Sequence, residues 1–226
     1  RDFMLIRDVV SLLVILGLAH WHIKISTAGD RALLGGDKEE AFRLGIYAKE
    51  KLRYFAAPIM VVYSVAFSLI CFDLTMSLAP TWFSTLWGGW SFAIMMQSLM
   101  ATILVFMFAL KQTSIGSFFA KQQYHDVGKL LHGFTVFFAY LTYAHVLTYW
   151  YINMPEETSY LLHRMKEPWF SLIVISPILS FLLPFIILIP KENKSTASVT
   201  LPCCFVVIFA QWLTYLLVVI PETVAH

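Results

Sequence analysis

The sequence is poor in charged residues. Asp, Glu, Lys and Arg make up 13% of its 226 residues, whereas ordinary soluble domains contain roughly 25%. Hydrophobic residues make up 59%, and the mean hydropathy is +0.72. A chain of this composition is not adapted to water as its main solvent, and we predict an integral membrane protein.

A strong excess of one charge sign is also missing, because the formal net charge is only +2. Both signs are mixed in the segment 24–54, which we expect to be a solvated connector with a surface helix. The sequence has no basic stripe for phosphates, no Gly-rich phosphate loop and no nucleophile elbow. This pattern argues against a nucleic-acid partner and leaves lipid as the expected surroundings.

Cysteine is scarce. Cys71, Cys203 and Cys204 lie in or beside apolar runs, without any CxxC, CxxCH or Cys/His ligand spacing. We therefore expect neither covalently attached haem nor an iron–sulfur cluster on this chain, and we interpret Cys203 and Cys204 as small packing residues. His132 and His145 at the two ends of one run invite a comparison with b-type cytochromes, but no second run carries a matching pair. We expect no metal ligands and no bound cofactor.

Long apolar runs dominate the sequence, and a run of about 20 residues can cross the bilayer as a helix. We predict six such helices at about 5–23, 55–78, 88–110, 130–152, 169–189 and 201–220. None of these runs alternates in polarity as the strands of a β-barrel do. The predicted fold is an all-α polytopic membrane protein with a single transmembrane domain over 1–226. Because the chain starts at Arg1 and its first run follows at once, we expect it to be N-terminally incomplete.

The basic residues indicate an orientation. With six spans the loops alternate sides, and 12 of the 16 Lys and Arg residues fall in 24–54, 111–129 and 190–200. Cytoplasmic loops carry the Lys and Arg excess, so we predict that these three segments are cytoplasmic. The segment YWYINMPEET (149–158) then lies on the outer side.

Two predicted spans carry polar residues that need a partner or a function at membrane depth. Asp73 lies near the outer end of the second span, with no Lys or Arg in that span and Ser77 one turn further on. It is either a protonatable site or a carboxylate bonded to neighbouring helices. In the fourth span a polar stripe on one helix face suits a proton path or interhelical hydrogen bonds; it comprises Thr135, Thr142, Tyr149 and Asn153, with His145 to one side.

Prolines and aromatic residues suggest further features. Pro177 and Pro184 in the fifth span predict a bent packing helix or a wedge that opens a cavity. We expect Gln97 to bond between helices. Aromatic residues gather at the predicted outer side, where an interfacial belt is more typical than a docking site for a subunit or quinone; they are Trp82, Phe83, Trp87, Trp90, Tyr149, Trp150, Tyr151 and Trp169.

Two stretches, FDLTMSLAPTWFSTLWGGWSF (72–92) and HDVGKLLHGFTVFFAYLTYAHVLTYWYINMPEET (125–158), resemble the NrfD-like membrane subunits of bacterial alternative complex III, closest to the ActF type. The family patterns read roughly FDWxMSLEPHWFSTxxG and HDxGKxxFxFxxFWAYxxFSQxxLIWYANxPEET. This chain matches them at Asp73, Met76, Ser77, Leu78, Pro80, Trp82, Phe83, Ser84, Thr85, His125, Asp126, Gly128, Tyr140, Trp150, Tyr151 and Asn153. Ala79, Thr81, His145 and Thr214 depart from the family, which has an acidic residue, His, Gln and Asp there.

The resemblance implies an NrfD-like helical bundle in a bacterial inner membrane, with an N-terminal part missing. It implies a subunit of a quinol:cytochrome c oxidoreductase that supports the oxidation of quinol or menaquinol and forms a proton half-channel. Its partners would be an iron–sulfur protein and haem c proteins, which carry the redox cofactors, and a paralogous NrfD-like subunit. A purely structural anchor and a quinone-binding subunit of another respiratory reductase are the alternatives.

The resemblance and the polar stripe together nominate two groups of site residues. The hypothetical proton pathway comprises Asp73, Ser77, His125, Asp126, Thr135, Thr142, His145 and Tyr149. The hypothetical outer-surface contact with partner subunits comprises Trp82, Asn153, Glu156 and Glu157.

Overall fold

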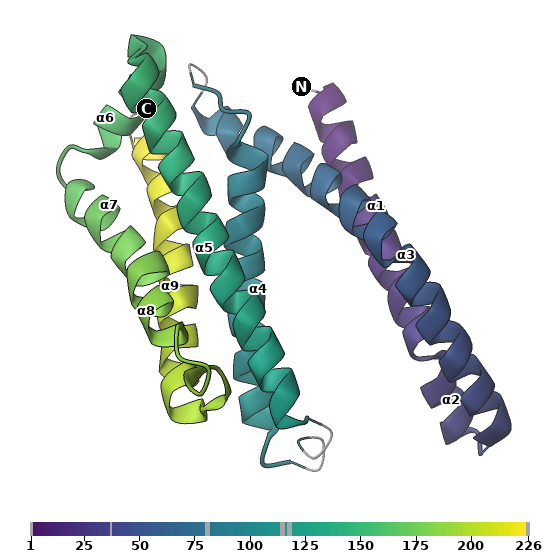
Figure 1. The fold of residues 1–226 in the computed structure, drawn as a ribbon. Helices are drawn as coiled ribbons and strands as arrows, with labels where there is room; N and C mark the ends of the chain where they lie inside the picture. Colours follow the sequence, from purple (N-terminus) through teal and green to yellow (C-terminus); the bar gives the residue numbers. More distant parts are fainter. Residues whose placement is uncertain (1, 37, 80–81, 114–115, 117–118, 225–226) are drawn as a thin grey trace. The chain divides into compact units, whose positions relative to one another are not determined.

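The computed structural model describes residues 2–36, 38–79, 82–113, 116 and 119–224, without the side chains of residues 33, 156, 157, 159 and 224. Every regular element in this part of the chain is helical (Figure 1). Six helical segments are long and apolar enough to cross a membrane, namely Asp2–Ser26, Lys38–Leu78, Trp87–Leu110, Lys121–Ile152, Phe170–Leu188 and Ala197–Thr223. The prediction of an all-α protein with six candidate spans is confirmed.

The first compact unit, Arg1–Asp73, contains α1 (Asp2–Ser26), α2 (Ala28–Leu34) and α3 (Lys38–Leu74). The surface helix expected in 24–54 is α2 together with the first turns of α3, which continues unbroken into the second span. Gly29 lets two backbones approach closely, since a Cβ at this position would lie 3.2 Å from the carbonyl oxygen of Ala41. Trp21 on α1 packs edge to face on Phe55 of α3.

The second unit, Leu74–His226, is built around a four-helix bundle. Its members are α4 (Trp87–Leu110), α5 (Lys121–Ile152), the broken helix formed by α7 (Phe170–Pro177), η3 (Ile178–Leu182) and α8 (Leu183–Leu188), and α9 (Ala197–Val224). Each member packs on its two neighbours, with α4 between α5 and α9 and with the broken helix closing the ring (Figure 1). Successive helices run in opposite directions. The short elements η1 (Met76–Leu78), α6 (Pro155–Arg164) and η4 (Asn193–Ser195) lie in the connections.

Two prolines explain why the fifth span is broken. Pro177 ends α7, the π-helical turn η3 follows, and Pro184 stands in the first turn of α8. A proline has no N–H to give to the carbonyl four residues earlier, so Pro184 leaves the Ser180 carbonyl without its helical donor. The kink therefore exposes a backbone acceptor inside the bundle.

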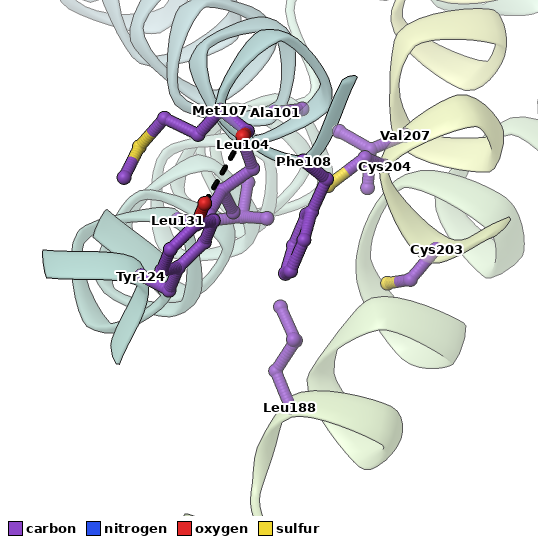
Figure 2. Close-up of a cluster of buried hydrophobic side chains, with 10 residues drawn as sticks. All are labelled: Ala101, Leu104, Met107, Phe108, Tyr124, Leu131, Leu188, Cys203, Cys204 and Val207. Carbon is purple, nitrogen blue, oxygen red and sulfur yellow. Dashed lines mark hydrogen bonds between the residues drawn. The ribbon is translucent and has the colours of Figure 1, made fainter. Parts of the chain in front are cut away.

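An apolar cluster fills the bundle near the connections 111–120 and 189–196, which we call the η4 end (Figure 2). Leu104, Leu131 and Val207 from three different helices are fully buried, and the small side chains of Cys203 and Cys204 let α9 approach. This confirms that the adjacent cysteines are packing residues. The hydroxyl of Tyr124 donates to the Met107 carbonyl at 3.0 Å, the dashed line of Figure 2.

The opposite end, which we call the α6 end, begins where α5 stops. Asn153 adopts a left-handed conformation (φ 50°), and its N–H donates to the Tyr149 carbonyl at 3.0 Å. Pro155 then occupies the first turn of α6, a position that suits its fixed φ and missing N–H. The predicted end of the fourth span at about residue 152 is confirmed.

The prediction of an interfacial aromatic belt is wrong for half of the eight residues assigned to it. Trp82, Trp87, Trp90 and Tyr149 are buried inside the α6 end, whereas Phe83, Trp150 and Tyr151 are exposed. Trp and Tyr suit a headgroup belt and a packed core with a hydrogen-bonded tip equally well, so composition alone does not separate the two environments.

Candidate functional site

Hydrogen bonds join α4 to α5 along the buried face that carries the predicted polar stripe. The Trp90 indole N–H donates to Thr142 Oγ1 at 2.9 Å, and Gln97 Nε2 donates to Thr135 Oγ1 at 3.0 Å. Trp90 and Gln97 are seven residues apart on α4. Their partners on α5 are also seven residues apart but in the reverse order, as expected for antiparallel helices. The stripe is confirmed for Thr135, Thr142, His145 and Tyr149, while Asn153 lies outside it as the exposed cap.

His145 is held at both ring nitrogens. Its Nδ1 lies 3.0 Å from the Leu141 carbonyl and its Nε2 lies 2.9 Å from Ser84 Oγ. A carbonyl only accepts, so Nδ1 carries a proton, and in the neutral ring Nε2 accepts from the Ser84 hydroxyl. Rotation of that hydroxyl would let Nε2 bind a second proton and donate it back to Ser84. The pair is therefore chemically able to take up and release a proton.

Gln97 on α4 forms hydrogen bonds with α5, η3 and α9 in the middle of the bundle. Its Nε2 also donates to the Ser180 carbonyl at 2.8 Å, the acceptor left open by Pro184, and its Oε1 accepts from Gln211 Nε2 on α9. The expectation that Gln97 bonds between helices is confirmed. Gln211 Oε1 is buried and accepts no hydrogen bond from the residues that the structure describes, so one polar atom at this level remains available.

A cavity of about 130 Å³ lies between this glutamine pair and α6. At roughly 30 Å³ per molecule in liquid water, it has room for about four waters. Ser176 Oγ and Thr214 Oγ1, which lie 2.7 Å apart, border it from α7 and α9. Its wall comprises Trp90, Phe138, Thr142, Tyr160, Arg164, Ile173, Ser176, Pro177, Thr214, Leu217 and Val218. The cavity is lined mainly by apolar groups but offers several hydroxyls.

Arg164 lines the cavity at the α6 end and is only 4% exposed. Its guanidinium donates to the carbonyls of Leu217 (2.9 Å) and Val218 (3.0 Å) and to Glu222 Oε1 (2.8 Å). Pro221 cannot donate to the Leu217 carbonyl, so Arg164 replaces the missing helical donor just as Gln97 does for Ser180. Sequence reasoning missed Arg164, although a proline near the end of a span signals a carbonyl in need of a donor.

Aromatic stacking surrounds this arginine. Its guanidinium lies 3.5 Å from the ring centroid of Tyr160, and the Tyr160 ring stacks on Trp82 at 3.9 Å and 9°. Burial raises the pKa of Tyr160 to about 12. Trp82, predicted to contact partner subunits, is 4% exposed and belongs to this internal stack. Asn153 is exposed, and the side chains of Glu156 and Glu157 lie outside the described residues.

The remaining predicted pathway residues do not join this site. His125 is buried and Asp126 exposed at the opposite end of α5, about 30 Å from His145 at 1.5 Å per residue. Between them stands a wholly apolar layer formed by Ala101, Leu104, Leu131, Cys204 and Val207. The hydrogen-bonded polar groups that begin at the α6 end therefore reach Gln97 and Gln211.

Asp73 belongs to the first unit, where Arg7 on α1 binds both of its carboxylate oxygens, with Nε at 2.8 Å from Oδ2. Asp8 lies beside the pair. This contact fits the second interpretation, a carboxylate bonded to a neighbouring helix, and the cation comes from the first span rather than from the span of Asp73. Ser77 does not share a helix face with Asp73, since α3 ends at Leu74 and Ser77 lies exposed in η1.

Within the described residues no three His, Cys, Asp or Glu side chains gather as a metal site. A scan against protein-family models finds no match to this chain, and a search of curated proteins finds none either. The case for a function therefore rests on the chain's own residues and geometry.

Proposed function

We propose that this chain is an NrfD-like, ActF-type subunit of a quinol:electron-acceptor oxidoreductase in a bacterial inner membrane, and that its bundle forms a proton half-channel. In this proposal quinol or menaquinol is the substrate of the complex. Iron–sulfur and haem c subunits carry the electrons, and this chain holds no redox cofactor itself. Its second unit provides a polar path that enters the membrane from one side and stops near the middle.

The observation that carries the proposal is the meeting of the two stretches that resemble the family. Ser84 and Trp90 from the first stretch bond to His145 and Thr142 from the second. Trp82 packs on Tyr149 with ring centroids 6.3 Å apart. The two stretches thus build one buried cluster, as expected if both serve one site. In this cluster Trp82 and Ser84 match the family pattern, whereas His145 departs from it.

The depth of the polar groups supports a half-channel in particular. From Trp87 to Gln97 the path covers about 15 Å at 1.5 Å per residue, half of a hydrocarbon core of roughly 30 Å. Water in the cavity would link Arg164 to Thr142 and to the Ser176–Thr214 pair. The His145–Ser84 pair would exchange protons with that water, and the apolar layer below Gln97 would end the path.

Under the predicted orientation, the segments 24–54, 111–129 and 190–200 are cytoplasmic and the half-channel opens outward. Lys121 is exposed and should react with a membrane-impermeant amine reagent only from the cytoplasmic side. Lys194 is unsuitable for that test, because it is 8% exposed and donates to the Ile189 carbonyl at 3.2 Å. A cysteine in place of Glu157 should be labelled only from outside, and the reverse pattern would overturn the orientation.

The proton path can be tested with a matched pair of threonine variants in the purified complex reconstituted in vesicles. Thr214→Val removes a hydroxyl that faces the cavity while keeping the side chain's shape. Thr102→Val is the control, because its hydroxyl donates to the Ser98 carbonyl of its own helix, away from the cavity. We expect Thr214→Val alone to lower proton release per quinol oxidised, with normal assembly. Equal proton release in both variants would refute the half-channel.

A structural anchor is the second candidate, favoured by the complete bonding of Gln97, His145 and Arg164 to protein groups. Such networks stabilise packing without conducting anything. A quinone-binding role at this cavity has less support, because ligand pockets usually measure about 300–1,000 Å³. The subunits that co-purify with the chain would separate a quinol:cytochrome c oxidoreductase from another respiratory reductase.

A further inference from the structure

Lys194 at the η4 end is a buried lysine with hydrogen-bond donors to spare. It stands in η4, in the connection between α8 and α9, and is 8% exposed. Its Nζ donates to the Ile189 carbonyl at 3.2 Å, whereas an ammonium group has three N–H donors. No carboxylate in the part of the chain that the structure describes pairs with it. A buried cation with one carbonyl as its partner is a favourable place for an anion.

Two further basic groups lie beside Lys194 on α5. Gly128 lets η4 approach this helix, since a Cβ there would lie 2.8 Å from the Cβ of Lys194. Lys129 follows, and burial together with the nearby charge of Lys129 lowers the pKa of Lys194. His132 lies about one turn further along α5, where its ring stacks on Phe185 of α8 with centroids 5.3 Å apart. Its Nδ1 is buried and has no hydrogen-bond partner among the described residues. Three basic groups therefore meet where η4, α5 and α8 pack together.

The chain's own acidic residues do not balance these charges. The segments 111–129 and 190–200 together contain five Lys and two acidic residues. One of these acids, Asp126, lies 3.5 Å from Lys129 Nζ, but both side chains are more than half exposed, and such a pair contributes little. Segment 24–54 carries seven basic and five acidic residues, and the whole chain has a net charge of +2. Neither that segment nor a second copy of the chain therefore brings a net negative charge to this place.

The three basic groups lie at the level expected for a membrane boundary. Lys194 stands in the connection between the fifth and sixth candidate spans. From His132 to the exposed Tyr151, α5 covers about 28 Å at 1.5 Å per residue, close to the roughly 30 Å of a hydrocarbon core. Ile186 and Ile189, at the adjoining end of α8, expose apolar side chains. A molecule with an anionic head and apolar chains would meet matching groups here.

We propose that Lys129, His132 and Lys194 bind the phosphate of an anionic phospholipid, whose acyl chains lie along the end of α8. Basic pockets between transmembrane helices suit such headgroups. The phosphate accepts from the Lys194 donors that the Ile189 carbonyl leaves open and from Lys129, and the imidazole can add a third N–H. The bound anion also offsets the repulsion between the two ammonium groups. The inference does not depend on the quinol-oxidising role.

Lipid binding to the purified full chain tests the site. The protein is delipidated in detergent and titrated with phosphatidylglycerol or phosphatidylcholine, and native mass spectrometry measures the lipid bound to the folded protein. Lys129→Gln and Lys194→Gln each remove one charge of the site. Lys121→Gln is the matched control, because Lys121 is an exposed lysine at the start of the same helix. We expect phosphatidylglycerol to bind preferentially, about fivefold more weakly in each site variant and unchanged in the control.

Several results of this titration would overturn the proposal. Equal binding of the two lipids would show that the site does not select an anionic headgroup. An equal loss in Lys121→Gln would show diffuse attraction by surface charge. Because Lys194 is buried and its variant can lose stability, Lys129→Gln, at an exposed side chain, decides the result, and unchanged binding there refutes the site.

Two further measurements separate the lipid from other anions. Inorganic phosphate at the same concentration should not displace phosphatidylglycerol, and displacement would assign the site to a soluble anion. Carbodiimide treatment of native membranes joins lysines to carboxylates that they touch. It should couple neither Lys129 nor Lys194 to segment 24–54, to a second copy or to another polypeptide. Any such product would make protein, rather than lipid, the occupant and overturn the proposal.

Discussion

The two ends of the four-helix bundle are stabilised in different ways. The η4 end packs Leu104, Leu131 and Val207 around two cysteines, and its buried polar side chains His125, Lys194 and Thr200 lie outside this cluster. The α6 end buries Trp90, His145, Gln97 and Arg164, each bonded to another element. A core in lipid gains little from the hydrophobic effect, so close packing suffices at one end and hydrogen bonds specify the other. The α6 end combines its hydrogen-bonded polar groups with a cavity, and this combination suits proton transfer.

Removing Arg164 should have the largest effect on this comparison. Arg164→Leu would leave the partly buried Glu222 without its cation and two buried carbonyls without this donor, at a cost of about 3–5 kcal/mol. We expect loss of the folded bundle in detergent, measured by thermal unfolding. Arg164→Leu together with Glu222→Gln should recover part of the stability. A fully stable single variant would contradict the role assigned to this arginine.

Gln97→Leu should cost less, about 1–3 kcal/mol for each buried group that it strands. The groups at risk are the Ser180 carbonyl and the amide of Gln211. Ser98→Ala is the matched control on the same helix, since the Ser98 hydroxyl donates to the Ile94 carbonyl of its own helix. Thermal unfolding of both variants measures the difference. Equal stability would show that the polar layer contributes nothing to the fold.

A comparable cost at the η4 end should come from steric overlap instead. A Cβ at Gly128 would lie 2.8 Å from the Cβ and 3.0 Å from the carbonyl oxygen of Lys194, so Gly128→Ala should destabilise the bundle by about 1–3 kcal/mol. Gly133→Ala, on the same helix with nothing within 4 Å of the added methyl, should be neutral or stabilising. Similar melting temperatures for the two variants would contradict this close contact.

The smallest expected effect is the pH response of Tyr160. Its pKa of about 12 exceeds the ordinary value of 10.0, because burial disfavours the phenolate. The unfolded chain therefore ionises this tyrosine first, and the stabilisation present below pH 10 is lost as the pH rises towards 12. The difference in ultraviolet phenolate absorption between the wild-type protein and Tyr160→Phe measures the titration. A midpoint near 10 would place Tyr160 in water.

The spans and the buried face of α5 were predictable, because apolar runs and helical spacing are local properties of a sequence. Arg7 with Asp73, and Arg164 with Glu222, were not, because these partners are 66 and 58 residues apart and their own neighbours do not reveal the pairing. The burial of the tryptophans was not predictable either. Burial of Trp82 and Trp90 depends on Tyr160 and Thr142, which only the folded bundle brings to them.

The two proline-capping contacts also have a consequence for biosynthesis. Helices enter the membrane in chain order, so Gln97 arrives before Ser180 and Gln211, and Arg164 arrives before Leu217. Until α9 has been inserted, the amide of Gln97 lacks its α9 partner and the guanidinium of Arg164 lacks the acceptors it finds there. A chain interrupted before its last helix thus exposes polar groups inside the bilayer. These are features by which membrane quality control could recognise an unfinished bundle.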